Sequence, residues 1–382
     1  MAEAFRRNPG IDALRGASIL LVVLHHVALR IPLKDTALAE FLPGRLLRGL
    51  SYNGYEAVFV FFVISGFLIA GHSLRRWGTL TAIDARAFYA RRIARILPCL
   101  LLLVAILGVL HLAGIDDYEI AREGQTLAGA VLSALGLYLN WYEGLTGWLP
   151  GGWDVLWSLS IEEAFYLLFP LGCLLVRQVR LLVLLLAVLA LSLPATRAAL
   201  AGNEIWQEKA YLPGMAAIAT GVLAALLAWH RAAGPALARA LVAMGLFGLS
   251  AVVLYGDMLW RAIGNGYMLV LTGAAASLVL GLHWRQAHVA NNGLRGLGWL
   301  RSFGRLSYEI YLGHMFVVFA VVAAFRASGG DLRDGFWWYL PAVVLAWALG
   351  ALVARLYSEP CDRALRRRWL AAPPSRVAAA GA

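Results

Sequence analysis

The chain has 382 residues, of which 61% are hydrophobic and 14% are charged, and its mean hydropathy is +0.71. A soluble domain carries about 45–50% apolar and about 25% charged residues, so this composition excludes a soluble globular protein. Apolar runs of about 15–22 residues recur along the chain, each about long enough to cross a ~30 Å hydrocarbon core as a helix. The composition therefore predicts an all-α, polytopic membrane protein.

The apolar runs predict eleven candidate helices, at residues 11–31, 55–73, 98–114, 127–142, 155–176, 181–195, 212–229, 236–256, 263–282, 303–325 and 336–357. The net charge of +11 indicates basic loops beside anionic lipid rather than nucleic-acid binding. Keeping the arginine-rich loops in the cytoplasm requires ten spans, with 127–142 re-entrant or peripheral. We therefore expect a protein of the cytoplasmic (inner) membrane with both termini cytoplasmic; the alternative is an eleventh span at 127–142.

The first apolar run could be mistaken for a cleaved signal peptide, because two arginines precede it. It contains Asp12, Arg15 and His26 and lacks a small-residue cleavage site, so we expect a retained helix. Residues 84–97 carry arginines along one side, which predicts a short amphipathic helix on the inner membrane surface. The three cysteines are far apart in sequence, so neither a disulfide framework nor a metal site is expected.

Ionisable residues in the first span are candidates for function, since each costs at least about 2.5–3.5 kcal/mol on insertion scales. Arg15 and His26 are eleven residues apart, almost three helical turns, so they project from one face about 16 Å apart. His25 points about 100° away from His26. The alternative is that Arg15 reaches the inner headgroups and His26 only hydrogen-bonds a neighbouring helix.

A second polar group lies at the start of the span at 155–176. Ser158, Glu162 and Tyr166 are spaced at i, i+4 and i+8 and form one polar stripe. We expect Glu162 at a depth comparable to His26, where a carboxylate orients the imidazole and raises its basicity, as a general base requires. The adjacent Glu163 has a plainer explanation, an acid favoured by the helix dipole.

Arginines gather on the expected cytoplasmic side. The set suited to binding phosphate through bidentate guanidinium groups is Arg15, Arg92, Arg95 and Arg305. For each arginine the alternative is attraction to lipid headgroups. The span at 303–325 adds Tyr308, Tyr311 and His314. A lone intramembrane histidine such as His314 is equally explained as a packing residue.

Common catalytic motifs are absent from the sequence: GxSxG, HExxH, the Walker-type phosphate loop and the HxxxxD of soluble-type glycerolipid acyltransferases. The stretch VISGF (63–67) is not a nucleophile elbow, and its Gly66 is expected to permit close helix packing. Any chemistry is therefore expected to depend on the intramembrane charged residues.

Five stretches of the chain resemble the acyltransferase 3 family of multi-span O-acyltransferases. They are IDALRGASILLVVLHH (11–26), VFVFFVISGFLI (58–69), FYARRIARILP (88–98), WSLSIEEAFYLLFP (157–170) and GRLSYEIYLGHMFV (304–317). The resemblance places Arg15 and His26 in the family's Arg-x10-His motif, and Arg92 and Arg95 in its RxxR motif. It implies a transmembrane domain at 1–370, and we expect no fused hydrolase-like domain of the kind that many relatives carry. The Ala-rich composition at the end of the chain predicts a disordered cytoplasmic tail at 371–382.

The resemblance implies transfer of an acyl group, usually acetyl, from cytoplasmic acyl-CoA to a hydroxyl of a cell-envelope saccharide, glycolipid or related acceptor. Acyl-CoA is then a co-substrate, and no bound cofactor is expected. The candidate catalytic residues are His26, Glu162 and Arg15. The candidate substrate-binding residues are Asp12, Arg92, Arg95, Ser158, Tyr166, Arg305, Tyr308 and His314. His26 is expected either to deprotonate the acceptor or to carry the acyl group covalently.

The segment before WSLS departs from the family pattern. Some relatives carry a histidine shortly before WSLS, whereas this chain has GWDVL (152–156), so no second base is expected there.

The alternative function is a transporter or flippase for an anionic lipid-linked saccharide, with the arginines along its path. The absence of an internal repeat argues against it, and consumption of acyl-CoA distinguishes the two. A structural scaffold would leave the intramembrane charges unexplained.

Overall fold

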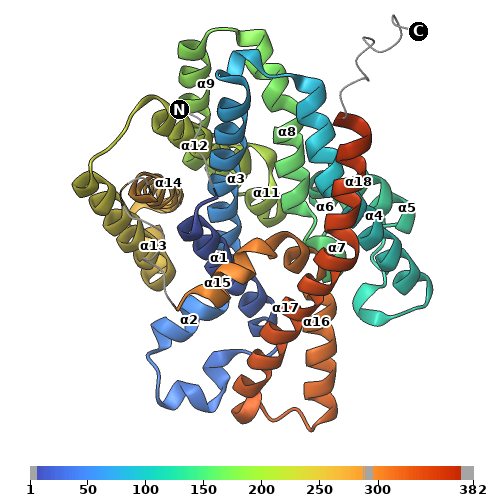
Figure 1. Cartoon of the computed structure of the whole chain (residues 1–382). Coiled ribbons are helices and arrows are strands. Elements are labelled where there is room, and N and C mark those ends of the chain that lie inside the picture. The colour runs from blue at the N-terminus through green and yellow to red at the C-terminus, as the bar shows by residue number, and fades with distance from the viewer. Residues whose placement is uncertain (1–6, 287, 289–295, 371–382) are drawn as a thin grey trace, which may run out of the picture.

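The computed structural model describes residues 7–286, 288 and 296–370, and these residues form helices and no strands (Figure 1). Eight helical segments are long and apolar enough to cross a membrane. They are Pro9–Ala28, Gly54–Trp77, Ala85–Leu112, Gly151–Val176, Glu204–His230, Pro235–Gln286, Ser307–Ala327 and Leu332–Leu370. The prediction of an all-α polytopic membrane protein is confirmed, and the count of ten spans stays a prediction. The predicted tail at 371–382 lies outside the described residues.

The helices follow one another with short connections. Their bounds are α1 (Pro9–Ala28), α2 (Gly44–Tyr52), α3 (Gly54–Trp77), α4 (Ala85–Leu112), α5 (Leu127–Leu135), α6 (Leu139–Thr146), α7 (Gly151–Asp154), α8 (Trp157–Val176), α9 (Val179–Leu191), α10 (Leu193–Ala198), α11 (Glu204–Lys209), α12 (Tyr211–His230), α13 (Pro235–Ile263), α14 (Tyr267–Gln286), α15 (Gly298–Arg305), α16 (Ser307–Ala327), α17 (Tyr339–Val353) and α18 (Glu359–Leu370). A π-helical turn, Ala354–Ser358, joins α17 to α18.

Three predicted segments differ from the structure. The segment 127–142 is broken at Leu137, whose φ is 63°, into α5 and α6. Neither piece reaches the ~30 Å needed to cross, so a single eleventh helix there is wrong. The expected span at 181–195 ends earlier, because α9 has 13 residues. The amphipathic stretch 84–97 is not a separate surface helix, since α4 continues through Pro98 for 28 residues.

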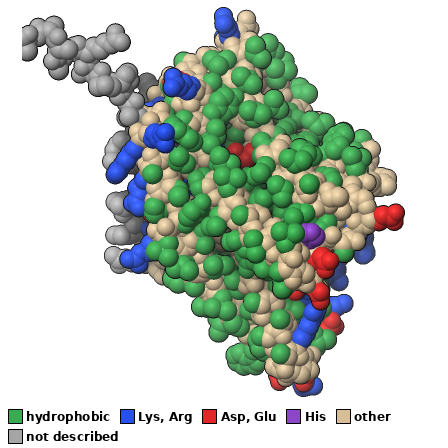
Figure 2. All heavy atoms as spheres, turned by 90° about the vertical axis from the view of Figure 1, so that its right-hand side faces the viewer, with side chains coloured by type: hydrophobic (Ala, Val, Ile, Leu, Met, Phe, Trp, Pro, Cys, Tyr) green, Lys and Arg blue, Asp and Glu red, His purple; other side chains and the backbone are tan. Residues whose placement is uncertain are grey.

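The outer surface of the bundle is apolar. Figure 2 shows one face on which hydrophobic side chains cover most of the surface and charged side chains gather near the edges. Large apolar side chains on several helices are open to the surroundings, including Leu112 at 76%, Leu175 at 82% and Phe247 at 78% exposure. In water such exposure would be unfavourable over so wide an area, whereas in lipid it is expected. This surface agrees with a membrane location.

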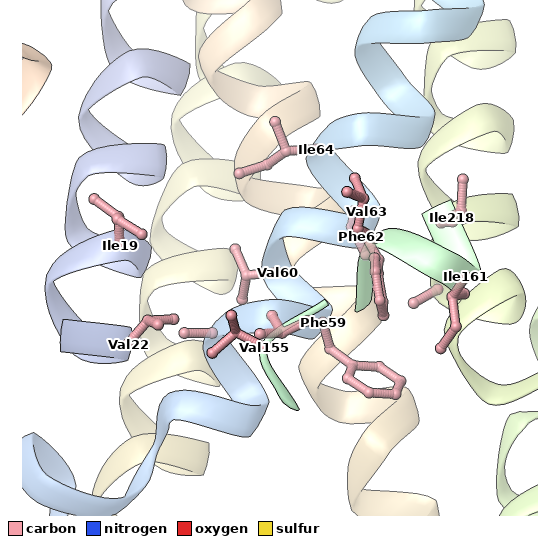
Figure 3. Packing of buried hydrophobic residues seen from close by; sticks show 14 of the residues in the cluster. Ile19, Val22, Phe59, Val60, Phe62, Val63, Ile64, Val155, Ile161 and Ile218 are labelled. Carbon is pink, nitrogen blue, oxygen red and sulfur yellow. The ribbon is translucent and has the colours of Figure 1, made fainter. Parts of the chain in front are cut away.

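The core forms where α1, α3 and α12 meet. Figure 3 shows Ile19 and Val22 of α1 on the side of α3 that carries Val60, and Ile218 of α12 on the other side of α3. The backbones of α3 and α12 come very close together. A methyl group added to Gly66 would fall on the carbonyl oxygen of Ile218, so the predicted role of Gly66 in close packing is confirmed.

A second close crossing joins α1 to α15. A methyl group on Gly304 would fall on the carbonyl oxygen of Asp12, and one on Gly16 would fall on that of Leu300. Only glycine permits this approach, because any Cβ would push the two backbones apart. The crossing brings the residues that follow Gly304 against the first turns of α1, where Arg15 lies.

Candidate active site

The arginine-rich ends of several helices enclose one large cavity, with a volume of about 1150 Å³. Its walls come from α1, α3, α4, α8, α16 and α18. The arginines that line it are Arg7, Arg15, Arg75, Arg76, Arg91, Arg92, Arg95, Arg305 and Arg366. The lining carboxylates are Asp12, Glu162, Glu163, Glu359 and Asp362. With nine arginines against five carboxylates, this arginine-lined cavity suits a polyanion.

Arg15 lies in the wall where α1 crosses α15. Its Nη2 donates to the hydroxyl of Ser307 at 2.8 Å, an interaction that the close Gly304 contact makes possible. Asp12, one turn earlier, accepts from Arg7 Nε at 2.8 Å. Arg305 also lines the cavity and is exposed. The two predicted phosphate-binding arginines of α1 and α15 thus line the same cavity, and their role stays a prediction.

Arg92 lies over the ring of Tyr166, with its guanidinium carbon 3.6 Å from the ring centroid. Its Nη2 is 3.7 Å from a carboxylate oxygen of Glu163 and 4.0 Å from one of Glu162. Glu162 also forms short contacts with the hydroxyls of Ser65 and Tyr166. Among the described residues, the buried Nε of Arg92 makes no hydrogen bond. This cluster therefore leaves one buried donor of Arg92 unsatisfied.

Arg95 has a different environment, although it lies one turn away on the same helix. Its Nη1 is 2.8 Å from Glu309 and 3.1 Å from the hydroxyl of Ser358, which itself donates to Glu309 at 2.6 Å. The Glu309 side chain is 1% exposed. This triad links α4, α16 and the π-helical turn, so Arg95 has a structural role in addition to lining the cavity.

The sequence reasoning missed Glu309. The available signal was the one applied to Arg15: Glu309 is an ionisable residue within an apolar segment. Its neighbour Tyr308, a predicted binding residue, donates to the carbonyl of Ile96 at 2.9 Å and lines the cavity. The motif GRLSYEIYLGH thus supplies both a structural acid and cavity wall.

His26 is half-buried and is not among the residues that line the cavity. Its Nδ1 is 2.9 Å from the carbonyl oxygen of Val22. A carbonyl only accepts, so Nδ1 carries the proton and Nε2 of the neutral ring carries the lone pair. The second imidazole at this site is His314, whose Nε2 is 3.4 Å from Nδ1 of His26. We call His26 and His314 the histidine pair.

The expected pairing of Glu162 with His26 is not what the structure shows. Glu162 contacts Arg92, Ser65 and Tyr166 in the cavity, whereas His26 contacts His314. Equal depth in two helices does not determine which side chains meet, because each helix also turns its polar face toward particular neighbours. The role of orienting His26 therefore does not belong to Glu162.

Ser158 and Tyr311 connect the cavity to the histidine pair. Both line the cavity, and their hydroxyls are 2.5 Å apart. The carbonyl oxygen of Tyr311 is 2.7 Å from Nδ1 of His314, and the two rings are 5.8 Å apart between centroids. One end of the cavity is thus separated from the histidine pair by a single residue. Among the described residues, no group of three or more His, Cys, Asp or Glu side chains could hold a metal ion.

Comparison with known proteins identifies the family of the chain. The family described as "Acyltransferase domain" (acyltransferase 3) matches residues 8–355. Over 172 residues the chain is 28% identical to O-acetyltransferase OatA of Staphylococcus aureus. Over 178 residues it is 30% identical to a Bacillus subtilis protein named "putative peptidoglycan O-acetyltransferase YrhL". Each match covers 44% of this chain and 24% of the relative, so the chain matches about a quarter of their length.

No solved structure matches the chain. The family match extends over most of the sequence and includes every candidate site residue. The chain therefore belongs to the acyltransferase 3 family.

Proposed function

We propose that the protein transfers an acyl group, most simply acetyl, from acyl-CoA to a hydroxyl of a cell-envelope saccharide. The observation that carries this proposal is the arginine-lined cavity of about 1150 Å³, one end of which adjoins the histidine pair through Tyr311. Membership of the acyltransferase 3 family agrees with it.

The donor fits the cavity by charge. Coenzyme A carries a diphosphate and a separate phosphate, and guanidinium groups bind phosphate through charge-assisted, bidentate hydrogen bonds. Arg15, Arg92 and Arg305 all line the cavity, and the Nε of Arg92 is an unsatisfied donor among the described residues. In our proposal these groups hold the phosphates, and the pantetheine arm extends toward Ser158 and Tyr311. The thioester is then close to the histidine pair.

The chemistry follows from the tautomer of His26. Its Nε2 lone pair takes the proton of the acceptor hydroxyl, and the resulting alkoxide oxygen attacks the thioester carbonyl carbon. The new ester C–O bond forms, the C–S bond breaks, and the thiolate of CoA leaves. The proton on His26 then passes to the thiolate and restores the neutral ring. A covalent acyl-His26 relay uses the same nitrogen as nucleophile.

The two routes predict different intermediates. Incubation with labelled acetyl-CoA and no acceptor leaves label on the protein only if the acyl group first moves to His26. Direct attack predicts an unlabelled protein that still releases CoA once the acceptor is added. The comparison requires a preparation whose activity with acceptor has been established.

The acceptor is proposed from the relatives and from topology. The Bacillus subtilis relative is named for peptidoglycan, and the Staphylococcus aureus relative is named as an O-acetyltransferase. The excess of arginine at the cavity end favours a cytoplasmic position for it, with both termini inside the cell. The acceptor would then approach the histidine pair from the outer half of the membrane.

The test is release of CoA by the purified protein in the presence of labelled acetyl-CoA and a cell-envelope extract. We expect the unmodified protein to release CoA and label an extract component, and His26→Ala to do neither. His230→Ala, which changes an exposed histidine at the end of α12, is the matched control and should remain active. An inert protein that nevertheless binds a lipid-linked saccharide would contradict the proposal and favour the transporter.

A further inference from the structure

His314 lies in α16 and is fully buried, with 0% exposure. The proposed binding of acyl-CoA in the cavity gives it no role. It does not line the arginine-lined cavity. Its ring packs edge-on against that of His26, with the centroids 4.9 Å apart and the planes at 69°. The nearest polar atoms of the two rings are His314 Nε2 and His26 Nδ1, at 3.4 Å. This geometry differs from the expectation that His314 binds acyl-CoA.

The backbone determines where the protons of the pair lie. The carbonyl oxygen of Tyr311 is 2.7 Å from His314 Nδ1, so that nitrogen carries the proton and Nε2 of His314 carries the lone pair. The Val22 carbonyl fixes His26 in the same tautomer. The lone pair on His314 Nε2 therefore lies near the N–H of His26 Nδ1, which is shared between His314 and Val22.

This arrangement resembles a general base held by an orienting partner. The N–H on one ring nitrogen determines that the other nitrogen is the basic one, and an acceptor beside that N–H stabilises the imidazolium formed during proton transfer. The other charged or titratable groups near His26 are His25, at 5.2 Å between ring centroids, and Arg30, which donates to the His26 carbonyl at 3.0 Å. Neither supplies an acceptor to Nδ1 of His26.

We propose that His314 is a positioning residue for His26: its Nε2 is a second, longer acceptor beside the His26 Nδ1–H that the Val22 carbonyl already receives, and its lone pair restrains the ring and stabilises the transient imidazolium. His314 stays neutral throughout and exchanges no proton with either substrate. The inference rests on the proposed acyl transfer and assigns to His314 the role that sequence reasoning had given to Glu162.

The chain allows a graded set of substitutions at this position. The amide of asparagine reaches about as far as a histidine Nδ1, so His314→Asn retains the bond to Tyr311 and loses the contact with His26. The amide of glutamine reaches about as far as Nε2, so His314→Gln presents its oxygen to His26. His314→Ala loses both contacts. His230→Ala again serves as the control histidine at the surface.

The experiment measures kcat and the acetyl-CoA KM of these variants in the CoA-release assay, with melting temperatures to compare folding. We expect kcat to fall at least about 10-fold in His314→Ala and His314→Asn, a part of the about 10²–10⁴-fold that general-base catalysis contributes. His314→Gln should recover most of kcat, and the acetyl-CoA KM should stay constant in all variants. If His314 only filled space, glutamine and asparagine would have similar effects on kcat. Recovery of kcat by glutamine but not by asparagine therefore indicates the contact with His26.

Three results would overturn the inference: an unchanged kcat in His314→Ala and His314→Asn, a raised KM at unchanged kcat, or a kcat in His314→Gln as low as in His314→Ala. If the alanine and asparagine variants do not fold, the glutamine variant alone decides, because retention of kcat supports the inference and its loss contradicts it. Failure of the proposed function is distinguishable, because then the unmodified protein releases no CoA.

Discussion

The arginine-lined cavity and the histidine pair meet at Tyr311, yet their polar groups are held in different ways. In the cavity, Arg15 and Arg92 bond mainly to side chains, and Arg92 retains an unused donor among the described residues. In the histidine pair, backbone carbonyls fix the proton on each ring. Side-chain partners can yield to a charged ligand, whereas backbone partners cannot move away. In our proposal this difference corresponds to donor binding in the first region and proton transfer in the second.

The largest expected effect separates the two regions directly. His26→Ala should lower kcat by about 10²–10⁴-fold, the usual contribution of a general base, and leave acetyl-CoA affinity unchanged. Arg92→Ala should weaken acetyl-CoA binding and leave kcat nearly unchanged, because it removes a hydrogen-bond donor to phosphate and leaves the histidine pair intact. Steady-state kinetics combined with equilibrium binding checks both. Loss of acetyl-CoA affinity in His26→Ala would show that His26 also contributes to donor binding, which contradicts separate roles for the cavity and the histidine pair.

The next effect is on stability and tests the distinction between Arg92 and Arg95. Glu309→Ala leaves Arg95 without its buried carboxylate, and breaking a buried ion pair in this way costs about 3–5 kcal/mol. The control is Glu40→Ala, whose pair with Arg333 is exposed on both sides and is worth at most about 1 kcal/mol. Thermal unfolding in detergent compares them. Equal melting temperatures for the two variants would show that the Arg95 triad is not structural.

A smaller effect is expected where α1 crosses α15. Gly304→Ala places a methyl group on the Asp12 carbonyl oxygen, and such overpacking costs about 1–3 kcal/mol. The displaced α15 should weaken the Arg15–Ser307 bond and raise the acetyl-CoA KM. Gly298→Ala, on the same helix with open space around it, should change neither quantity. A normal KM and melting temperature in Gly304→Ala would argue that the crossing does not position Arg15.

The smallest effect concerns the exposed arginine of the cavity. Arg305→Ala should raise the acetyl-CoA Kd only a few-fold, since exposed ion pairs are worth about 0.2–1 kcal/mol. Added salt should weaken binding to the unmodified protein more than to this variant, because salt screens exposed charges. An affinity that is independent of salt in both proteins would place the phosphates away from Arg305.

Much of the fold could be predicted from the sequence because apolar runs report burial in lipid directly. The first helix follows from its apolar run, and the close packing at Gly66 follows from a glycine within an apolar helix. The pairing of His26 with His314 could not be predicted, since it depends on the contact between α1 and α16. For the same reason Glu162 was expected beside His26 but contacts Arg92. Periodicity defines the faces of a helix and leaves the neighbours of each face undetermined.

The prediction of a separate surface helix at 84–97 was wrong for a different reason. Residues 84–97 are amphipathic because Arg92 and Arg95 point into the arginine-lined cavity, not because the segment lies flat on a membrane. A polar face that lines an internal cavity and one that contacts lipid headgroups have the same sequence pattern. Only the positions of α8 and α16, which supply the carboxylates, distinguish the two.

The most direct test of the account is equilibrium binding of acetyl-CoA to the purified protein, measured for the unmodified chain, Arg15→Ala and His26→Ala. We expect the unmodified protein and His26→Ala to bind acetyl-CoA equally well and Arg15→Ala to bind it more weakly. Absence of binding to the unmodified protein, or equal binding to all three, would contradict the claim that the arginine-lined cavity holds the acyl donor.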